Sequence, residues 1–286
     1  MDLGIGLPTW GRHADPEAIA GVALEAERAG LGAVWTGERL LRPAEPLLAG
    51  TDQVLPLPDG IGAMYDPLET LAYVAAKTST IRLGTSVVDA LFHNPVVLAK
   101  RLATLDRLSG GRAMIGLGQG WMQQEFDATG VPARRRGAGF EEHLAAMRAC
   151  WGPDPVRFDG RFYSIPESQI GPKPTGLTLL AGAAAPAAIE RAARLGLGMT
   201  VVVFAWEQLR DAVQTYGKGQ GPLVAQINGS VTDRPLDERM PLTGSVEQVA
   251  EDLAEVRAMG VDHVCWQTFD ADPAEMVGRI QQLNTY

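Results

Sequence analysis

The chain has little cysteine and no excess of positive charge. Its two cysteines, Cys150 and Cys265, stand far apart among 286 residues and form no CxxC or His/Cys cluster. This excludes a disulfide-stapled scaffold and argues against a zinc site, so we expect no metal. The 25 Lys and Arg residues are outnumbered by 34 Asp and Glu, which gives a formal net charge of −9. We therefore expect neither nucleic acid nor an anionic membrane surface as a partner.

Long apolar runs are missing as well. No run reaches the roughly 18 residues that a membrane-spanning helix needs. The opening residues 1–4 carry no basic segment of the kind that begins a signal peptide. With 46% hydrophobic and 21% charged residues, the composition is typical of a globular protein. We expect a cytoplasmic protein that acts on a small molecule.

The sequence does contain a repeated alternation of short β-branched runs and amphipathic stretches. The expected strands are 3–8, 33–36, 81–88, 112–117, 177–181, 199–204, 223–231 and 261–268. The expected helices are 15–29, 66–77, 95–108, 140–151, 186–195, 206–216, 245–259 and 273–283. Eight strand–helix units in a chain of this length predict an α/β fold, a closed (β/α)8 TIM barrel formed by residues 1–286 as one domain. A doubly wound open sheet shares the alternation and is the alternative.

Two segments interrupt the alternation. Residues 40–65 are rich in proline and glycine and too long for a plain connection. Residues 153–175 form a second excursion, with a hairpin expected at 156–165. We expect both to be insertions in the barrel that shape the substrate pocket.

Active sites of TIM barrels lie where the strands end, and two strand ends rich in small residues draw attention. The segment 116–121, GLGQGW, is either a flexible strand exit or a backbone cleared of Cβ atoms so that a flat ring can lie against it. The segment 182–186, GAAAP, is either an ordinary tight loop or a set of free amides at a helix N-terminus that would bind a phosphate. The basic run at 134–136 is either solvated surface or a clamp for a polyanionic tail.

Four motifs follow one another in the middle of the chain. N-P-V-V-L-A-K occupies residues 94–100, L-D-R-L-S-G-G-R residues 105–112, G-L-G-Q-G-W residues 116–121 and E-F residues 125–126. With G-I-G-L-P near the start and R-L-G-T-S-V before the first motif, they make the chain resemble the bacterial luciferase-like superfamily. Within it, the chain is most similar to the F420-dependent oxidoreductases.

The resemblance implies a TIM barrel with insertions that uses coenzyme F420 or, alternatively, FMN; a homodimer is expected. It implies a non-proline cis peptide at Ser86-Val87 beneath the cofactor ring. It also implies cofactor contacts at Gly118, Gln119, Gly120 and Gln124, and phosphate contacts at Gly182, Ala183, Ala184 and Ala185. Asp106 and Arg112, which belong to the family pattern, are interpreted as a structural ion pair.

One position departs from this pattern. Many F420-dependent relatives carry Asp-His at the end of the second strand, whereas this chain has Glu38-Arg39. Glu38 then takes over proton handling, or pairs with Arg39 as a structural carboxylate. Alternatively, the reaction needs no side-chain acid here, or the protein binds its cofactor without turnover.

The leading hypothesis is an F420-dependent oxidoreductase with Glu38 as the catalytic residue. A hydride would pass between C5 of the deazaflavin and a small organic substrate bound among Trp10, Arg39, His93 and Trp121. The alternatives are an FMNH2/O2-dependent luciferase-like monooxygenase and a non-catalytic carrier of a flavin or deazaflavin. The identity of the substrate is not legible in the sequence.

Overall fold

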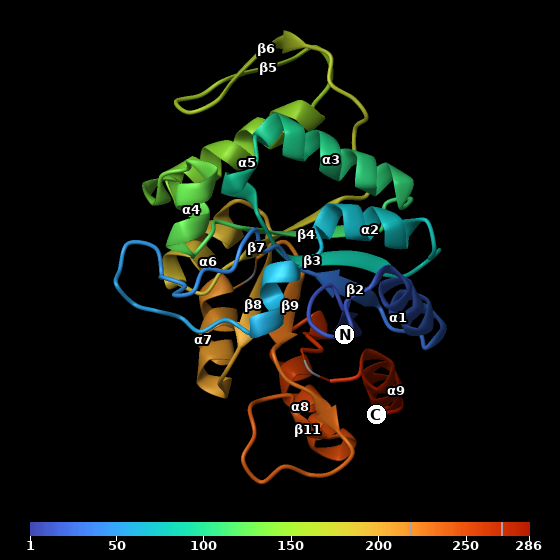
Figure 1. Ribbon diagram of the computed structural model, residues 1–286. Helices are drawn as coiled ribbons and strands as arrows, with labels where there is room; N and C mark the ends of the chain where they lie inside the picture. The colour runs from blue at the N-terminus through green and yellow to red at the C-terminus, as the bar shows by residue number, and fades with distance from the viewer. Residues whose placement is uncertain (218, 270) are drawn as a thin grey trace.

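Eight parallel strands close into a barrel in a computed structural model that describes residues 1–217, 219–269 and 271–286 (Figure 1). Their order around the barrel is β1-β12-β9-β8-β7-β4-β3-β2. The strands are β1 (Asp2–Gly6), β2 (Ala33–Thr36), β3 (Arg82–Asp89), β4 (Ala113–Gly118), β7 (Thr178–Gly182), β8 (Gly198–Val203), β9 (Leu223–Ile227) and β12 (His263–Trp266). The closed parallel barrel confirms the predicted (β/α)8 fold and excludes the open sheet.

Helices connect successive strands and surround the barrel. They are α1 (Pro16–Arg28), α2 (Pro67–Ala75), α3 (Pro95–Leu108), α5 (Ala138–Trp151), α6 (Pro186–Arg194), α7 (Trp206–Tyr216), α8 (Val246–Ala258) and α9 (Pro273–Leu283). Helices α1, α2, α3 and α9 begin alike, with an Asp or Asn that accepts hydrogen bonds from the first-turn amides and a proline at the first helical position. Because this signal is local, the sequence predicts all four starts to within a residue.

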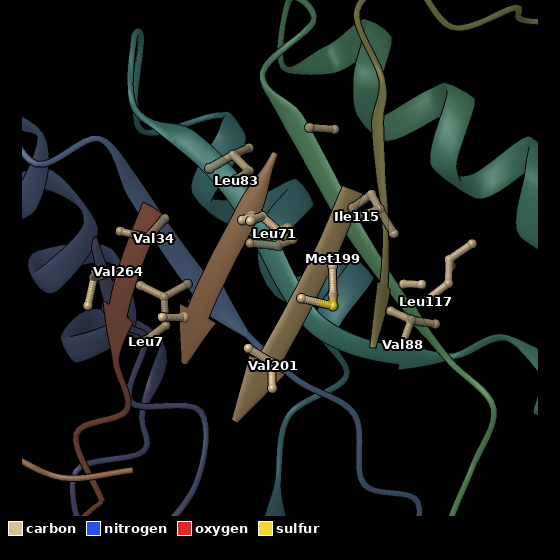
Figure 2. Packing of buried hydrophobic residues seen from close by; sticks show 14 of the residues in the cluster. Leu7, Val34, Leu71, Leu83, Val88, Ile115, Leu117, Met199, Val201 and Val264 are labelled. Atoms are coloured by element: carbon tan, nitrogen blue, oxygen red, sulfur yellow. The ribbon is translucent and has the colours of Figure 1, made fainter. Parts of the chain in front are cut away.

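Apolar side chains fill both the interior of the barrel and the layer between strands and helices. Trp35 lies inside and is fully buried, in space that Gly4 and Gly84 leave open because a Cβ on either would collide with its indole. Outside the barrel, strand residues such as Val34 and Leu83 belong to one buried cluster with Leu71 of α2 (Figure 2). The barrel is therefore a packed core, and only its ends are open to ligands.

Two elements differ from the predictions. The single strand expected at 223–231 is divided into β9 and a short β10 (Val231–Thr232), which pairs with β11 (Gly244–Ser245). A seven-residue helix, α4 (Gln123–Thr129), follows β4 and was not predicted. Within the described part of the chain its N-cap residue, Met122, has no capping side-chain hydrogen bond, so the usual helix-start signal is missing.

The expected ion pair between Asp106 and Arg112 is wrong. Asp106 Oδ2 accepts hydrogen bonds from the backbone amides of Thr175 and Gly176. Arg112 donates instead to the hydroxyl of Thr78 and to the backbone carbonyls of residues 75, 78, 81 and 109. Each side chain fastens a separate loop at the amino-terminal end of the barrel.

The segments 40–65 and 153–175 leave the barrel on different sides. The first contains a short 3-10 helix, η1 (Asp59–Ala63), and is tied to the chain after β4, where the Ala49 amide donates to the Trp121 carbonyl and the Gln123 amide to the Leu47 carbonyl. The second carries the expected hairpin, β5 (Val156–Asp159) with β6 (Ser164–Ser168), next to α5. Among the described residues, no helix has the length and apolarity to cross a membrane.

Candidate active site

The carboxyl ends of β2 and β3 bring Glu38 and His93 together. Glu38 lies two residues beyond β2, and His93 follows the short helix η2 (Ala90–Phe92) after β3. Glu38 Oε1 is 2.7 Å from His93 Nε2, and Glu38 Oε2 accepts the backbone amide of Asp89 at 2.7 Å. Both oxygens of the Glu38 carboxylate are therefore occupied by groups from β3 and the connection that follows it.

The charge on Glu38 controls the protonation of His93. Burial lowers the pKa of the imidazole, but the hydrogen bond and negative charge of Glu38 outweigh burial, so the pKa is raised above its ordinary value. The His93 side chain keeps 16% of its surface exposed. Its Nδ1 has no hydrogen-bond partner among the described residues and is not among their fully buried unpartnered atoms. His93 thus has one nitrogen fixed and the other open.

Asp89, the last residue of β3, is a carboxyl group that the sequence analysis missed. It is buried, and Oδ1 accepts the amide of Gly120 at 2.9 Å. Burial raises its pKa to about 7; Arg39 opposes this, while the negative charges of Glu38 and Glu125 add to it. Asp89 therefore changes charge close to neutral pH.

Arg39 points to a different carboxylate from the one expected. Its Nη1 lies 2.7 Å from Glu125 Oε2 in a buried ion pair, and Glu125 Oε1 also accepts the amide of Leu40 at 2.8 Å. The guanidinium carbon lies 5.0 Å from the ring centroid of Trp121. The interpretation of Glu38 and Arg39 as a pair is wrong: Glu38 binds His93, and Arg39 binds Glu125 beneath Trp121.

A second histidine, His143 of α5, lies behind His93. Its Nε2 is 3.1 Å from the His93 carbonyl oxygen and must donate to it, because a carbonyl only accepts. Burial lowers the pKa of His143 to about 4, with the His93 carbonyl opposing and the charges of His93 and Arg135 adding to the shift. His143 is therefore neutral near pH 7 and supports the backbone of His93.

The third strand carries an irregularity where the ring of a cofactor is expected. The Ser86-Val87 peptide bond is cis, as the resemblance implies, and the register with β4 shifts between Thr85 and Val88. The Ser86 hydroxyl is 2.8 Å from the hydroxyl of Thr200 on β8. Ser86 and Val87 are both partly exposed.

Glycines around this irregularity make room for the Val87 side chain. A Cβ on Gly118 would lie 2.6 Å from Val87 Cγ2, and a Cβ on Gly182 would lie 2.7 Å from Val87 Cγ1. A Cβ on Gly118 would also collide with the Asp89 carboxyl group. The lack of side chains at these positions thus serves the packing of Val87 and Asp89, a role that the sequence analysis did not assign.

The segment 182–186 ends in an open helix N-terminus. Ala184, Ala185 and Pro186 are exposed, and within the described residues the N-cap Ala185 makes no side-chain hydrogen bond to the first turn of α6. The amide of Ala183, however, donates to the carbonyl of Thr200 at 3.2 Å, so it belongs to the sheet. The exposed end of α6 offers backbone amides and a positive dipole.

Other predicted site residues have structural partners. Gln119 Oε1 accepts the amide of Gly137 at 2.7 Å. Both ends of the Gln124 amide bind the 40–65 segment, through the Glu45 carbonyl and the Leu47 amide. Trp10 packs edge-on against Phe269, with ring centroids 5.3 Å apart, near the ends of β1 and β12. Trp10 is thus placed beyond a different pair of strands from those that carry Glu38 and His93.

The basic run at 134–136 is largely packed onto rings. The guanidinium of Arg135 lies 3.8 Å from the Phe162 ring centroid, and that of Arg136 lies 5.7 Å from the Phe126 ring centroid and donates to the Ala49 carbonyl. Arg134 is exposed. Arg135 and Arg136 therefore fasten the two excursions, while Arg134 and Arg136 both stay exposed, as expected of solvated surface.

Comparison with known proteins gives one family. A family model for luciferase-like monooxygenases matches residues 3–222. An uncharacterized protein of Mycobacterium tuberculosis is 37% identical over 189 residues, which are 64% of this chain and 66% of that protein. An F420-dependent glucose-6-phosphate dehydrogenase of Kineococcus radiotolerans is 31% identical over 201 residues, 68% of this chain and 55% of that enzyme. The matches span less than two thirds of the length of these relatives.

Solved structures agree on the fold. A monooxygenase from Streptomyces bottropensis superposes with a TM-score of 0.79 at 23% identity, covering 99% of this chain and 97% of that one. A coenzyme F420 dependent tetrahydromethanopterin reductase from Methanopyrus kandleri also gives a TM-score of 0.79, at 17% identity over 98% and 97%. At such identities the likeness supports the barrel and says nothing of the reaction. The family model covers more than half of the chain, and the protein is a member of the luciferase-like monooxygenase family.

Proposed function

We propose that the protein is an F420-dependent oxidoreductase that acts on a small organic substrate. The observation that supports this most is its 31% identity with an F420-dependent glucose-6-phosphate dehydrogenase over 68% of the chain. A histidine ion-paired to a carboxylate at the strand ends is consistent with it, because oxidation or reduction at an oxygen-bearing carbon needs a proton donor or acceptor.

The residues present fit a deazaflavin cofactor with a phosphate. The open N-terminus of α6 is exposed, and the backbone amides of Ala184 and Ala185, with about half a positive charge, would hold the phosphate. Ser86 and Val87 are partly exposed and would support the ring. When bound, F420 supplies a two-electron carrier that takes up or gives a hydride at C5 of its deazaflavin.

The protein's own side chains would bind the substrate and handle its proton. The Trp121 ring offers an apolar surface. The guanidinium of Arg39 lies against this ring, and its charge is neutralised by Glu125. Glu38 and His93 form the titratable pair. This combination favours an uncharged organic group next to a hydroxyl or carbonyl.

An FMN-dependent monooxygenase is the second candidate, and the description of the matching family favours it. The two candidates differ in what the protein consumes. We expect the protein, mixed with F420 and propan-2-ol, to bleach the deazaflavin absorbance. With reduced FMN in place of F420, we expect no more oxygen uptake than reduced FMN shows without the protein. Transfer of an oxygen atom from O2 to the substrate with reduced FMN, and no change in F420, would favour the monooxygenase. Tight cofactor binding with neither reaction would point to a carrier.

A further inference from the structure

We propose that His93, through Nδ1, transfers the proton to or from the substrate oxygen, and that Glu38 is a positioning residue behind it. The proposal rests on the oxidoreductase function proposed above and names the catalytic group within that site. It moves the proton-handling role from the second strand, where the family pattern places a histidine, to the connection that follows the third.

Glu38 is poorly placed to meet a substrate itself. Its side chain is only 3% exposed. One carboxylate oxygen binds His93 Nε2 and the other accepts the Asp89 amide, both at 2.7 Å. A substrate hydroxyl would have to displace one of these bonds and leave a buried donor without a partner, which is unfavourable.

His93 has the arrangement that proton transfer requires. Because Nε2 faces a carboxylate, the neutral imidazole keeps its hydrogen on Nε2 and leaves the lone pair on Nδ1. Nδ1 is the open nitrogen, with no partner in the described part of the chain. A carboxylate that orients one imidazole nitrogen while the other reacts is a recurring arrangement in acid–base catalysis.

The surrounding charges favour this role. The groups that act on His93 come from several elements: Glu38 beyond β2, Asp66 at the start of α2, Arg101 on α3, and His143 on α5. Asp89, Arg39 and Glu125 lie next to Glu38. His143 is neutral near pH 7 and does not compete for the proton, so Glu38 is the dominant partner.

The step assigned to His93 is proton transfer alone. In the oxidising direction the substrate O–H bond breaks and an N–H bond forms at Nδ1, while the electron pair of the O–H bond stays on oxygen. That oxygen becomes a carbonyl oxygen as the adjacent C–H hydrogen leaves with its two electrons to the bound carrier. The imidazolium then releases its proton to solvent, and the reducing direction is the reverse.

The first test needs no substrate. Diethyl pyrocarbonate, which modifies unprotonated accessible imidazole nitrogens, is applied to the protein with and without saturating F420, and modified histidines are mapped by mass spectrometry. We expect His93 to react in the free protein and to be protected at least tenfold by F420, whereas His13, at the start of α1, reacts in both. An unreactive His93, or one that F420 does not protect, would overturn the proposal. If F420 does not bind, the proposed function fails, and the reactivity of His93 in the free protein still decides whether Nδ1 is open.

The second test separates catalysis from structure. We expect His93→Gln to lower turnover of the substrate by ~10²–10⁴ while leaving the Kd for F420 within twofold, and His13→Gln to change neither. Glu38→Gln removes the charge that raises the pKa of His93, so the acid limb of kcat/KM for oxidation should move to lower pH. Full turnover in His93→Gln, or an unmoved acid limb in Glu38→Gln, would contradict the assignment.

Discussion

Burial decides which acidic residues of the strand-end site carry charge. Asp89 is buried and its pKa is raised to about 7, and burial also raises the pKa of Glu125; the charge of Arg39 opposes both shifts. Asp89 accepts the amide of Gly120, and Glu125 binds Arg39 and the amide of Leu40. The effect of each carboxyl group on the free energy of unfolding can be measured in single variants.

Asp89 should make the protein less stable as pH rises. Its pKa is 3.8 when unperturbed and about 7 in the fold, so between these values the folded state binds the proton more tightly. The contribution of Asp89 to stability is then greatest below about pH 4 and is lost as pH rises through 7, by at most about 4 kcal/mol. Asp89→Asn should flatten this slope in urea denaturation at pH 5, 6, 7 and 8, and the exposed Asp52→Asn should not. Equal slopes for wild type and Asp89→Asn would show that Asp89 is not the titrating group.

Breaking the buried ion pair should be costly. Glu125→Gln leaves Arg39 charged and buried, since the two side chains are only 1% and 9% exposed. We expect a loss of about 3–5 kcal/mol in the free energy of unfolding. Glu255→Gln, which breaks the exposed pair with Arg210, should cost less than about 1 kcal/mol. Similar losses in the two variants, measured by urea denaturation, would contradict this account.

Among the secondary-structure elements, β3 and α6 carry the features that a cofactor would meet. The irregular part of β3 is locked by the fit of Val87 between glycines of β4 and β7. The start of α6 is open, whereas α1, α2, α3 and α9 close theirs with a side-chain cap. Packing therefore fixes the irregular part of β3, whereas the first-turn amides of α6 are left available to a ligand.

A methyl group on Gly182 should strain β3. Its Cβ would sit 2.7 Å from Val87 Cγ1, so Gly182→Ala should lower the free energy of unfolding by about 1–3 kcal/mol. Val87→Ala should remove most of that loss in the double variant. Gly21→Ala on α1, where nothing lies within 4 Å, should instead stabilise by roughly 0.5–1 kcal/mol. An additive double variant in a double-mutant cycle would mean that Val87 is not the obstacle.

An acidic side chain at the open end of α6 should repel a phosphate. Ala184 is exposed, so Ala184→Asp should weaken F420 binding more than tenfold, on the order of 1.4 kcal/mol, with the melting temperature almost unchanged. FMN binding should fall as well, because both cofactors carry a phosphate. Ala254→Asp, with the same charge change on the exposed side of α8, should leave both affinities intact. Unchanged affinities in Ala184→Asp would place the phosphate elsewhere in the barrel.

For the whole molecule, the fold is readable from the sequence and the site only in part. Strand–helix alternation and Asp-Pro or Asn-Pro helix starts are local signals, and they predict the barrel and most element bounds. Asp89 and Glu125 give no such signal, although Asp89 ends a β-branched run and Glu125 lies in the E-F motif. Their role is visible only in the folded chain, where the amide of Asp89 on β3 donates to Glu38 and Glu125 on α4 binds Arg39.

The same limit explains the errors. Gln124 stays a predicted cofactor contact, and its amide also binds the 40–65 segment, a partner that no local pattern links to α4. Asp106 and Arg112 are near in sequence, yet each has backbone partners that only the folded chain brings close. The homodimer and the cytoplasmic location stay predictions from the sequence.

The central claim is the identity of the cofactor, and side-by-side equilibrium titration of the purified protein with F420 and FMN tests it most directly. Both cofactors would use the open end of α6, so a difference in affinity would come from the parts in which the two molecules differ. We predict that F420 binds at least ten times more tightly than FMN, a difference of about 1.4 kcal/mol or more. Equal affinities, or tighter binding of FMN, would contradict the assignment and make the flavin-dependent monooxygenase the better account.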